Sequence, residues 1–119
     1  MLEESLMPSF GGGSIAIWTM GKWESQLLDV SLHSNTSDVW TALTWVEEGT
    51  TDETKAYVRV DILDSAKATL QTDISGLLAN GRMSINLGDY ANVVGVDMYV
   101  RFKLYAKTQT PIISDVVVT

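Results

Sequence analysis

The chain has 119 residues, a length that suits a single domain. Apolar residues make up 45% of it and charged residues 19%, a balance that can bury a core and excludes an intrinsically disordered chain. The 15 acidic residues outnumber the 8 basic ones, and the formal charge of -7 repels phosphate backbones and anionic membrane surfaces. We therefore expect no nucleic acid partner.

The chain contains no cysteine, which excludes disulfides, zinc thiolate clusters and thiol nucleophiles. The compartment stays open, because a reducing cytosol, secretion and assembly inside an infected host all fit this composition. No apolar run approaches the ~20 residues that span a bilayer, and the first residues lack the basic and apolar regions of a signal peptide. We expect a complete, soluble chain without membrane insertion.

The first thirteen residues predict an extended N-terminal arm. Pro8 and the three glycines of residues 11–13 disfavour both strand and helix, so this segment is interpreted as an arm on a flexible hinge. The domain boundaries expected are 1–13 for the arm and 14–119 for a folded domain. The arm carries four large apolar side chains that we expect to bind a partner: Leu2, Leu6, Met7 and Phe10.

From residue 14 onward, short runs rich in Val, Ile, Thr, Trp and Tyr are separated by Gly, Asn, Asp and Ser clusters, a pattern typical of strands and turns. Only 75–80 and 90–96 could hold a helical turn, and glycines interrupt both. The sequence therefore predicts strands over 14–20, 23–31, 39–47, 56–63, 68–74, 82–87, 98–107 and 113–119.

Two of these runs, 56–63 and 98–107, alternate strictly between apolar and polar residues. Such alternation is typical of antiparallel sheets with one face on a core and one face in water. We expect two antiparallel sheets packed face to face. Tyr57, Arg59 and Asp61 should lie on the wet face of the first run, and the inner faces should hold Val58, Val60, Ile62, Val100, Phe102 and Leu104.

Tryptophans and the wet face of 98–107 are the candidate functional residues. Trp40 and Trp45 are interpreted as core, whereas Trp18 and Trp23 flank the turn 19–22 and are expected to be partly exposed, as a ligand platform or a subunit contact. The wet face is either a solvated face with cross-strand pairs or an interface, since Tyr and Arg are enriched where proteins meet. The predicted surface comprises Trp18, Trp23, Tyr57, Arg59, Tyr99, Arg101 and Tyr105, with Lys103 and Lys107 beside them.

Catalytic chemistry is not predicted. The single histidine, His33, lies in the polar loop 32–38, where neighbours along a loop rarely form a preorganised triad. The acidic residues of 47–53 are interpreted as a solvated strand connection, with a structural calcium loop as the alternative. We expect a non-enzymatic protein with no cofactor and no metal site.

The order of several motifs resembles that of a galactose-binding-like jelly-roll module. The resemblance covers roughly residues 21 to 119 and rests on Gly21 to Asp29, Trp40 to Trp45, Tyr57 to Val60, Tyr99 to Leu104 and Thr110 to Val118. Such modules recur in tail fibres, head appendages and decoration proteins of tailed bacteriophages, and in bacterial cell-surface proteins. The resemblance implies an all-β, eight-stranded antiparallel jelly-roll β-sandwich and a role in adhesion or virion architecture.

Two functions follow as hypotheses. The first is a virion structural protein, a capsid decoration, head-appendage or tail component that is assembled in the host cytoplasm and binds capsid or tail subunits through its arm. A homo-oligomer is expected, with a trimer favoured. The second is a carbohydrate-binding or adhesion module that recognises a cell-surface glycan, secreted or displayed on a bacterial surface. The arm favours the first, because a free-standing sugar binder has no use for it.

Overall fold

The fold was analysed in a computed structural model, which describes residues 2–3, 17–34 and 38–119. Among these residues, no helix has the length and the apolar composition that crossing a membrane requires. The elements are β1 (Leu2–Glu3), β2 (Thr19–Glu24), a short helix α1 (Val30–His33), β3 (Ala42–Glu48), β4 (Ala56–Leu63), β5 (Thr69–Ile74), β6 (Leu77–Ala79), β7 (Arg82–Asn86), a 3-10 turn η1 (Leu87–Asp89), β8 (Tyr99–Ala106) and β9 (Ile112–Val118).

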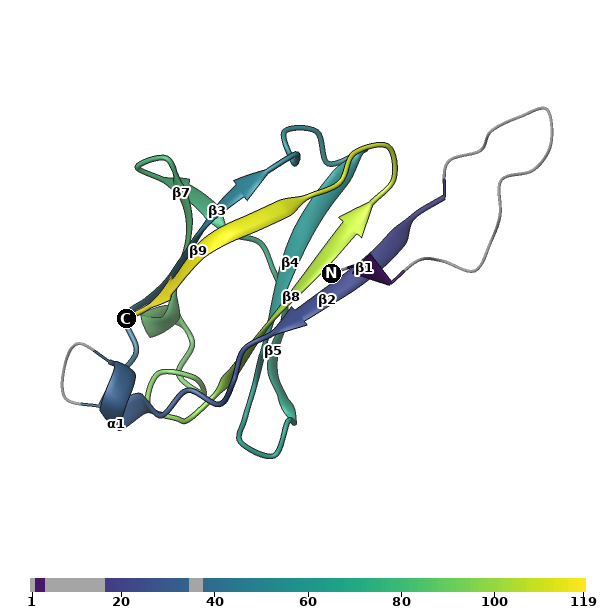
Figure 1. Cartoon of the computed structure of the whole chain (residues 1–119). Coiled ribbons are helices and arrows are strands. Elements are labelled where there is room, and N and C mark those ends of the chain that lie inside the picture. The colour runs from purple at the N-terminus through teal and green to yellow at the C-terminus, as the bar shows by residue number, and fades with distance from the viewer. Residues whose placement is uncertain (1, 4–16, 35–37) are drawn as a thin grey trace, which may run out of the picture.

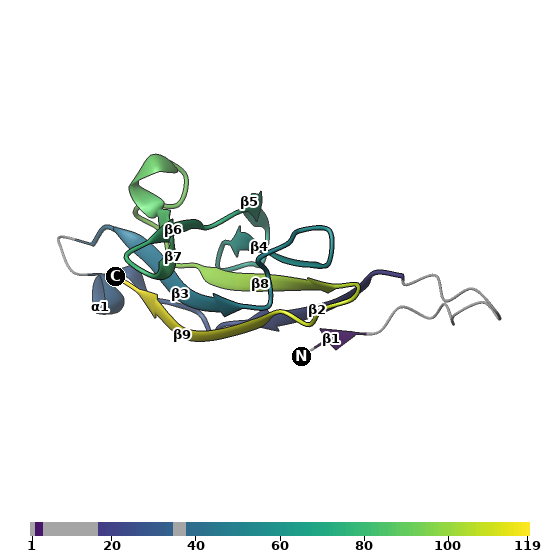
Figure 2. The ribbon, with the colours of Figure 1, turned by 90° about the horizontal axis from the view of Figure 1, so that it is seen from above.

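The strands form two antiparallel sheets that face one another (Figures 1 and 2). The five-stranded sheet has the order β1-β2-β8-β4-β5, and the four-stranded sheet has the order β6-β7-β3-β9. The predicted all-β sandwich with antiparallel sheets is therefore confirmed. Most of the predicted strand ranges also agree with the structure to within a few residues, and the range 56–63 matches β4 without change.

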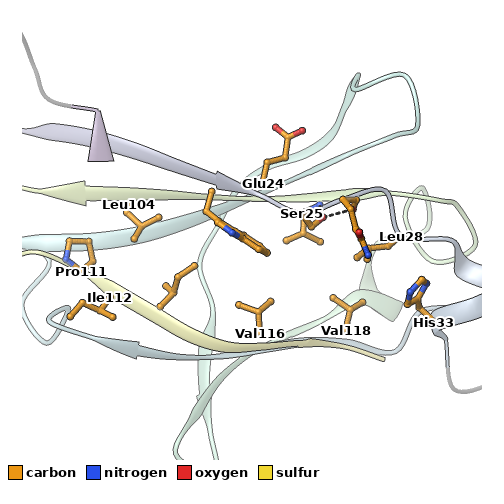
Figure 3. Close-up of a pocket in the computed structure, with 13 residues that line it drawn as sticks. Glu24, Ser25, Leu28, His33, Leu104, Pro111, Ile112, Val116 and Val118 are labelled. Atoms are coloured by element: carbon orange, nitrogen blue, oxygen red, sulfur yellow. Dashed lines mark hydrogen bonds between the residues drawn. The ribbon is translucent and has the colours of Figure 1, made fainter. Parts of the chain in front are cut away.

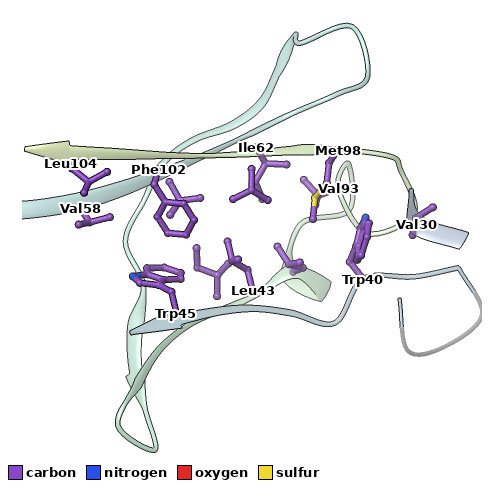
Figure 4. Packing of buried hydrophobic residues seen from close by; sticks show 14 residues of the cluster. Val30, Trp40, Leu43, Trp45, Val58, Ile62, Val93, Met98, Phe102 and Leu104 are labelled. Carbon is purple, nitrogen blue, oxygen red and sulfur yellow. The ribbon is translucent and has the colours of Figure 1, made fainter. Parts of the chain in front are cut away.

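Strands β4 and β8 form the centre of the five-stranded sheet, because their strict alternation lets each bury one whole face. Val58 pairs with Leu104, Val60 with Phe102 and Ile62 with Val100, and all six side chains are buried as predicted. Trp40 and Trp45 are also buried, which confirms their interpretation as core residues. Figure 4 shows Trp45 of β3 and Phe102 of β8 meeting between the sheets, with their ring centroids 5.0 Å apart.

Asp61 contradicts the prediction that it lies on a wet face, since only 5% of its surface is exposed. Its carboxylate accepts hydrogen bonds from the Thr72 hydroxyl and the Asp73 backbone N–H of β5, both at 2.9 Å, and it lies 3.0 Å from Nζ of Lys103. Strand β5 and the long neighbouring side chains cover the carboxylate, and these partners satisfy it. Alternation alone could not reveal that cover.

The predicted strand over 23–31 is wrong in its second half. Strand β2 ends at Glu24, and Asp29 caps helix α1 by accepting hydrogen bonds from the N–H and the hydroxyl of Ser31, at 2.9 and 2.6 Å. A polar side chain that satisfies a free helical N–H outweighs the strand propensity of this stretch. The predicted turn over 19–22 is also wrong, because these residues lie inside β2, and Ile17 and Trp18 of the predicted strand over 14–20 are not in a strand.

A further strand, β6, was expected at most to be a helical turn. Asn80 and Gly81 both have positive φ, at 50° and 82°, and so form the tight turn that joins β6 to β7. An Asn-Gly pair is the strongest short hairpin signal in a sequence. Of the predicted arm, residues 1–13, only Leu2 and Glu3 are described, and their backbones pair with Gly21 and Met20 of β2. The apolar arm residues Leu6, Met7 and Phe10 lie outside the described residues.

The two sides of the sandwich differ. On one side the outer strands β5 and β6 are joined directly by Ser75 and Gly76, so the chain itself links the two sheets. We call this the closed side. On the other side β2 faces β9, and Figure 2 shows both strands running along the same edge of the molecule. We call this the open side, because within the described part of the chain only β1 lies outside either strand, pairing with Gly21 and Met20.

Candidate functional site

A groove opens between the two sheets along the open side, with a volume of about 890 Å³ (Figure 3). Trp23 of β2 is one of the lining residues. Leu104, Pro111 and Ile112 lie toward one end of the groove, and Val118, Leu28 and His33 lie toward the other. Trp23 also packs at a tilt on the buried Phe102, with ring centroids 5.8 Å apart. We call this cavity the β2–β9 groove.

One wall of the groove is shaped where the chain leaves β2. The Ser25 N–H donates to the Val100 carbonyl at 2.9 Å, and the Ser25 hydroxyl accepts from the Val100 N–H at 3.0 Å. Leu28 then exchanges backbone hydrogen bonds with Met98. The segment after β2 therefore stays attached to β8 without forming a regular strand. Its apolar side chain Leu28 faces the groove while α1 bounds that end (Figure 3).

The opposite wall is β9, the outer strand of the four-stranded sheet. Its register on β3 shifts between Thr44 and Val46, and Asp115 sits at this bulge with a φ of 52°. Arg82 of β7 holds the bulge, because its guanidinium donates hydrogen bonds to both the side chain and the backbone carbonyl of Asp115. The bulge lets Ile113, Val116 and Val118 all line the groove.

The lining is mostly apolar, and Ser25, His33 and Glu24 among its polar residues make contacts within the chain. The Ser25 hydroxyl donates to the Gln26 carbonyl at 2.8 Å, and Nδ1 of His33 lies 3.1 Å from the Asp29 carbonyl oxygen. The Glu24 carboxylate pairs with Lys67 at 2.8 Å and with Arg101 at 3.4 Å. The hydrogen bond from Lys67 is the main reason why the pKa of Glu24 is below its ordinary value. The groove is thus suited to an apolar guest.

A second surface lies on the outer face of the five-stranded sheet, at the end near Thr19. The rings of Tyr57 and Tyr105 stack with centroids 4.4 Å apart, and Trp18 meets Tyr57 edge-on at 5.2 Å. Arg59 lies over the Tyr57 ring and Lys107 over the Trp18 ring, at 4.6 and 5.8 Å. Burial raises the pKa of Tyr105 above its ordinary value. We call Trp18, Tyr57 and Tyr105 the outer aromatic cluster.

The other end of the same outer face is ionic. Lys103 contacts the carboxylates of Asp61 and Asp73, and Arg101 lies between Glu24 and Asp61. Burial opposes ionisation of Asp61, but hydrogen bonds from the Asp73 N–H, Lys103 and Thr72 outweigh it and lower its pKa. We call Glu24, Asp61, Asp73, Arg101 and Lys103 the outer ionic cluster.

The structure divides the predicted surface residues among three places. Trp18, Tyr57, Arg59 and Tyr105 meet at the outer aromatic cluster. Arg101 belongs to the outer ionic cluster, and Tyr99 lies beside it under the ammonium of Lys67, 4.7 Å from the ring centroid. Trp23 faces the groove instead, 41% exposed.

Sequence reasoning missed the groove itself. Its β9 wall was predicted as an ordinary strand, although the run Ile112 and Ile113 followed by Val116, Val117 and Val118 is unusually apolar for a strand that ends up at an edge. Within the described residues, no group of three or more His, Asp or Glu side chains is placed to hold a metal ion. Comparison of the whole chain with family models, curated proteins and solved structures finds no match.

Proposed function

We propose that this chain is a non-catalytic structural protein of a virion, a capsid decoration, head-appendage or tail component, that works by assembly with neighbouring subunits. The observation that carries the assembly part is the β2–β9 groove. It is a long apolar cavity left open along the edge of a packed sandwich. Protein interiors are normally packed with few voids larger than a water molecule, so a groove of this kind favours occupation by a partner.

The groove supports binding rather than catalysis through the state of its polar groups. Ser25 and His33 are each engaged with backbone carbonyls, and the hydrogen bond of the Ser25 hydroxyl runs to Gln26. A nucleophile needs a base that accepts its proton and a third group that orients that base. An assembly role needs only apolar walls, which β2, the segment after it and β9 provide, and a free strand edge, which β9 provides.

The virion location and the N-terminal arm belong to the same proposal. The location is supported by the resemblance of the motifs in residues 21–119 to phage jelly-roll modules. The arm is supported by composition, since residues 1–13 combine Leu2, Leu6, Met7 and Phe10 with a run of glycines. In this proposal the arm binds capsid or tail subunits or another copy of the chain, and the assembled form is a homo-oligomer, with a trimer favoured.

The jelly-roll assignment is a further part of the proposal. The connections β2–β3, β3–β4, β7–β8 and β8–β9 each pass from one sheet to the other. Such crossings are what a roll built from two Greek keys requires. The arrangement departs from the usual roll in one respect, because β2 and β9 lie in different sheets instead of pairing with one another.

Light scattering of the purified full chain over a range of concentrations tests the assembly proposal. We expect an oligomer that is lost when residues 1–13 are deleted, while the melting temperature stays close to that of the full chain. A chain that stays monomeric at every concentration, and that binds neither capsid nor tail proteins, would contradict the proposal.

A second candidate function, glycan binding, is favoured by the outer aromatic cluster. Stacked tyrosines beside an indole, with Arg59 and Lys107 at the rim, offer flat apolar faces and hydrogen-bond donors to a sugar ring. A glycan array probed with the full chain tests it. Tyr105→Ala should abolish a genuine signal, whereas Leu32→Ala, at an exposed position on α1, should leave it unchanged.

A further inference from the structure

We propose that the β2–β9 groove is the receptor for residues 4–16 of a second copy of this chain, with Leu6, Met7 and Phe10 entering between the sheets. This inference deepens the proposed assembly function and rests on it. It names both the site on the accepting copy and the segment that the donating copy supplies.

The groove has the character of an unfinished core. Trp23, Ile113 and Val116 face a cavity of about 890 Å³ between the sheets, and behind them lie the fully buried Val100 and Phe102. Further exposed apolar side chains lie in the strands and loops that border it, since Leu27 is 39% exposed and Ile112 54%. Filling such a space with apolar side chains removes both their surface and that of the walls from water.

The free backbone edge favours a peptide over a small apolar molecule. Strand β9 pairs with β3 on one side only, so its other edge offers N–H and carbonyl groups along Ile112–Val118. An added peptide segment can hydrogen-bond to that edge while its alternate side chains enter the groove. A hydrocarbon chain would fill the cavity but leave those backbone groups to water.

The N-terminal residues already add a strand to a sheet on this side of the molecule. Leu2 and Glu3 add to the outer edge of β2 at Gly21 and Met20, directly next to the groove. The segment that follows, residues 4–16, has one charged residue, Glu4, among several large apolar ones. Every copy has a net charge of -7, but a segment with so few charges is repelled only weakly by another copy. The groove does not repel such a segment either, because the negative charge of Glu24 is paired with Lys67 and Arg101.

The attachment points allow residues 4–16 to reach a neighbouring copy. Strand β1 runs antiparallel to β2, so the chain passes Glu3 in the direction of Thr19, and the described chain resumes at Ile17 beside that same end. Both attachment points therefore lie at one end of β2. The thirteen residues between them can reach about 20 Å out and back, enough to enter the groove of an adjoining molecule.

Site-specific disulfide cross-linking tests the proposal, because the full chain has no cysteine of its own. One copy carries Phe10→Cys and a second copy, labelled with 15N, carries Val116→Cys in the groove wall. After mild oxidation, mass spectrometry of the mixture should find a mixed-label disulfide dimer. The matched control replaces Val116→Cys by Ala66→Cys, an exposed position in the turn between β4 and β5, and should give at least about tenfold less product.

Two variants of the segment test its contribution to the dissociation constant of self-association. Phe10→Asp should raise the dissociation constant of self-association at least about tenfold, because it removes the burial of one large apolar side chain. Ser9→Asp adds the same charge at the neighbouring position and should change the dissociation constant less than about threefold. The melting temperature of a dilute sample reports whether either variant perturbs the sandwich itself.

Three outcomes would overturn the inference. The first is cross-linking to Val116→Cys no stronger than to Ala66→Cys. The second is an intramolecular disulfide in a chain carrying both Phe10→Cys and Val116→Cys that forms equally at every concentration, since it would place the segment in its own groove. The third is equal weakening by Phe10→Asp and Ser9→Asp. In each case, self-association that persists in light scattering leaves the proposed assembly function standing and rejects only this site.

Discussion

The closed and open sides of the sandwich are built from the same kind of strand, yet only the closed side is sealed. There, β5 and β6 are joined by Ser75 and Gly76, and the crossing chain packs directly on the ring of Trp45. On the open side, Trp23 and Val116 face one another across the β2–β9 groove without such a crossing. The comparison teaches that the completeness of a β-sandwich core depends on how its edges are connected. It depends much less on how apolar its strands are.

The largest effect should come from the residue that lies between the two sides. Phe102 packs edge-on against Trp45 and at a tilt against Trp23, and it is fully buried. Phe102→Ala should lower the free energy of unfolding by about 3–5 kcal/mol, through lost burial and the cavity that it leaves. Denaturant unfolding followed by tryptophan fluorescence measures this loss. A melting temperature within a degree of the wild type would contradict the strand register described above.

Next in size is the loss of the hydrogen bonds that hold β5 on the closed side. Asp61→Asn removes the charge that accepts from Thr72 and Asp73 and that faces Lys103, and should cost about 1.5–3 kcal/mol. The control Asp73→Asn removes the exposed partner of Lys103 and should cost about 1 kcal/mol or less.

The same carboxylate predicts an acid dependence. Its pKa is lower in the folded state, so its contribution is complete above the ordinary value of 3.8 and disappears as the pH falls through the lowered pKa. The free energy of unfolding of the wild type should therefore fall as the pH is lowered through this acid range. In Asp61→Asn the free energy of unfolding should depend less on pH over the same range. An unchanged pH profile in the variant would mean that the carboxylate does not hold β5.

The chain that connects the two sheets on the closed side is packed too tightly to accommodate an added methyl group. A Cβ at Gly76 would lie 2.6 Å from two ring atoms of the buried Trp45. Gly76→Ala should therefore destabilise the sandwich by about 1–3 kcal/mol, because the indole has no room to move. Gly95→Ala is the matched control, since its nearest neighbour would be 3.9 Å away. Equal melting temperatures for the two variants would show that the closed side is less tightly packed than described.

The smallest effect should distinguish the two sides most directly. Val60→Thr introduces a hydroxyl of nearly equal size into the sealed core and should cost about 1–2 kcal/mol, since the site is apolar. Val116→Thr makes the same change in the groove wall and should alter stability by about 0.5 kcal/mol or less. Chemical unfolding of both variants side by side checks this. If Val116→Thr proved as costly as Val60→Thr, the groove would already be filled within a single chain.

The features that the sequence predicted are those that depend on neighbours along the chain. Alternation in β4 and β8 places their side chains on opposite faces of a strand, and this local rule held for Val58, Val60 and Phe102. It failed at Asp61, because the cover over that carboxylate comes from β5 and from Lys103, which pair with β4 only in the folded sheet.

The candidate site was less predictable for the same reason. Trp23 and Val116 are separated by most of the chain, and their side chains line one cavity only because β2 and β9 lie on the same side of the two opposing sheets. Strand order arises from long-range pairing that no local pattern encodes. Helix α1 and the hairpin at Asn80 were also missed, although their signals are local: a capping aspartate and an Asn-Gly pair.

The Asp115 bulge interrupts the free backbone edge of β9. A flat apolar edge without interruptions is a template on which copies could stack end to end without limit, as in amyloid. Arg82 locks Asp115 into a left-handed backbone conformation in the middle of the β9 edge, so a continuous ladder along all of it is interrupted there. A single guanidinium on β7 thus helps to keep this exposed edge from serving as one continuous template.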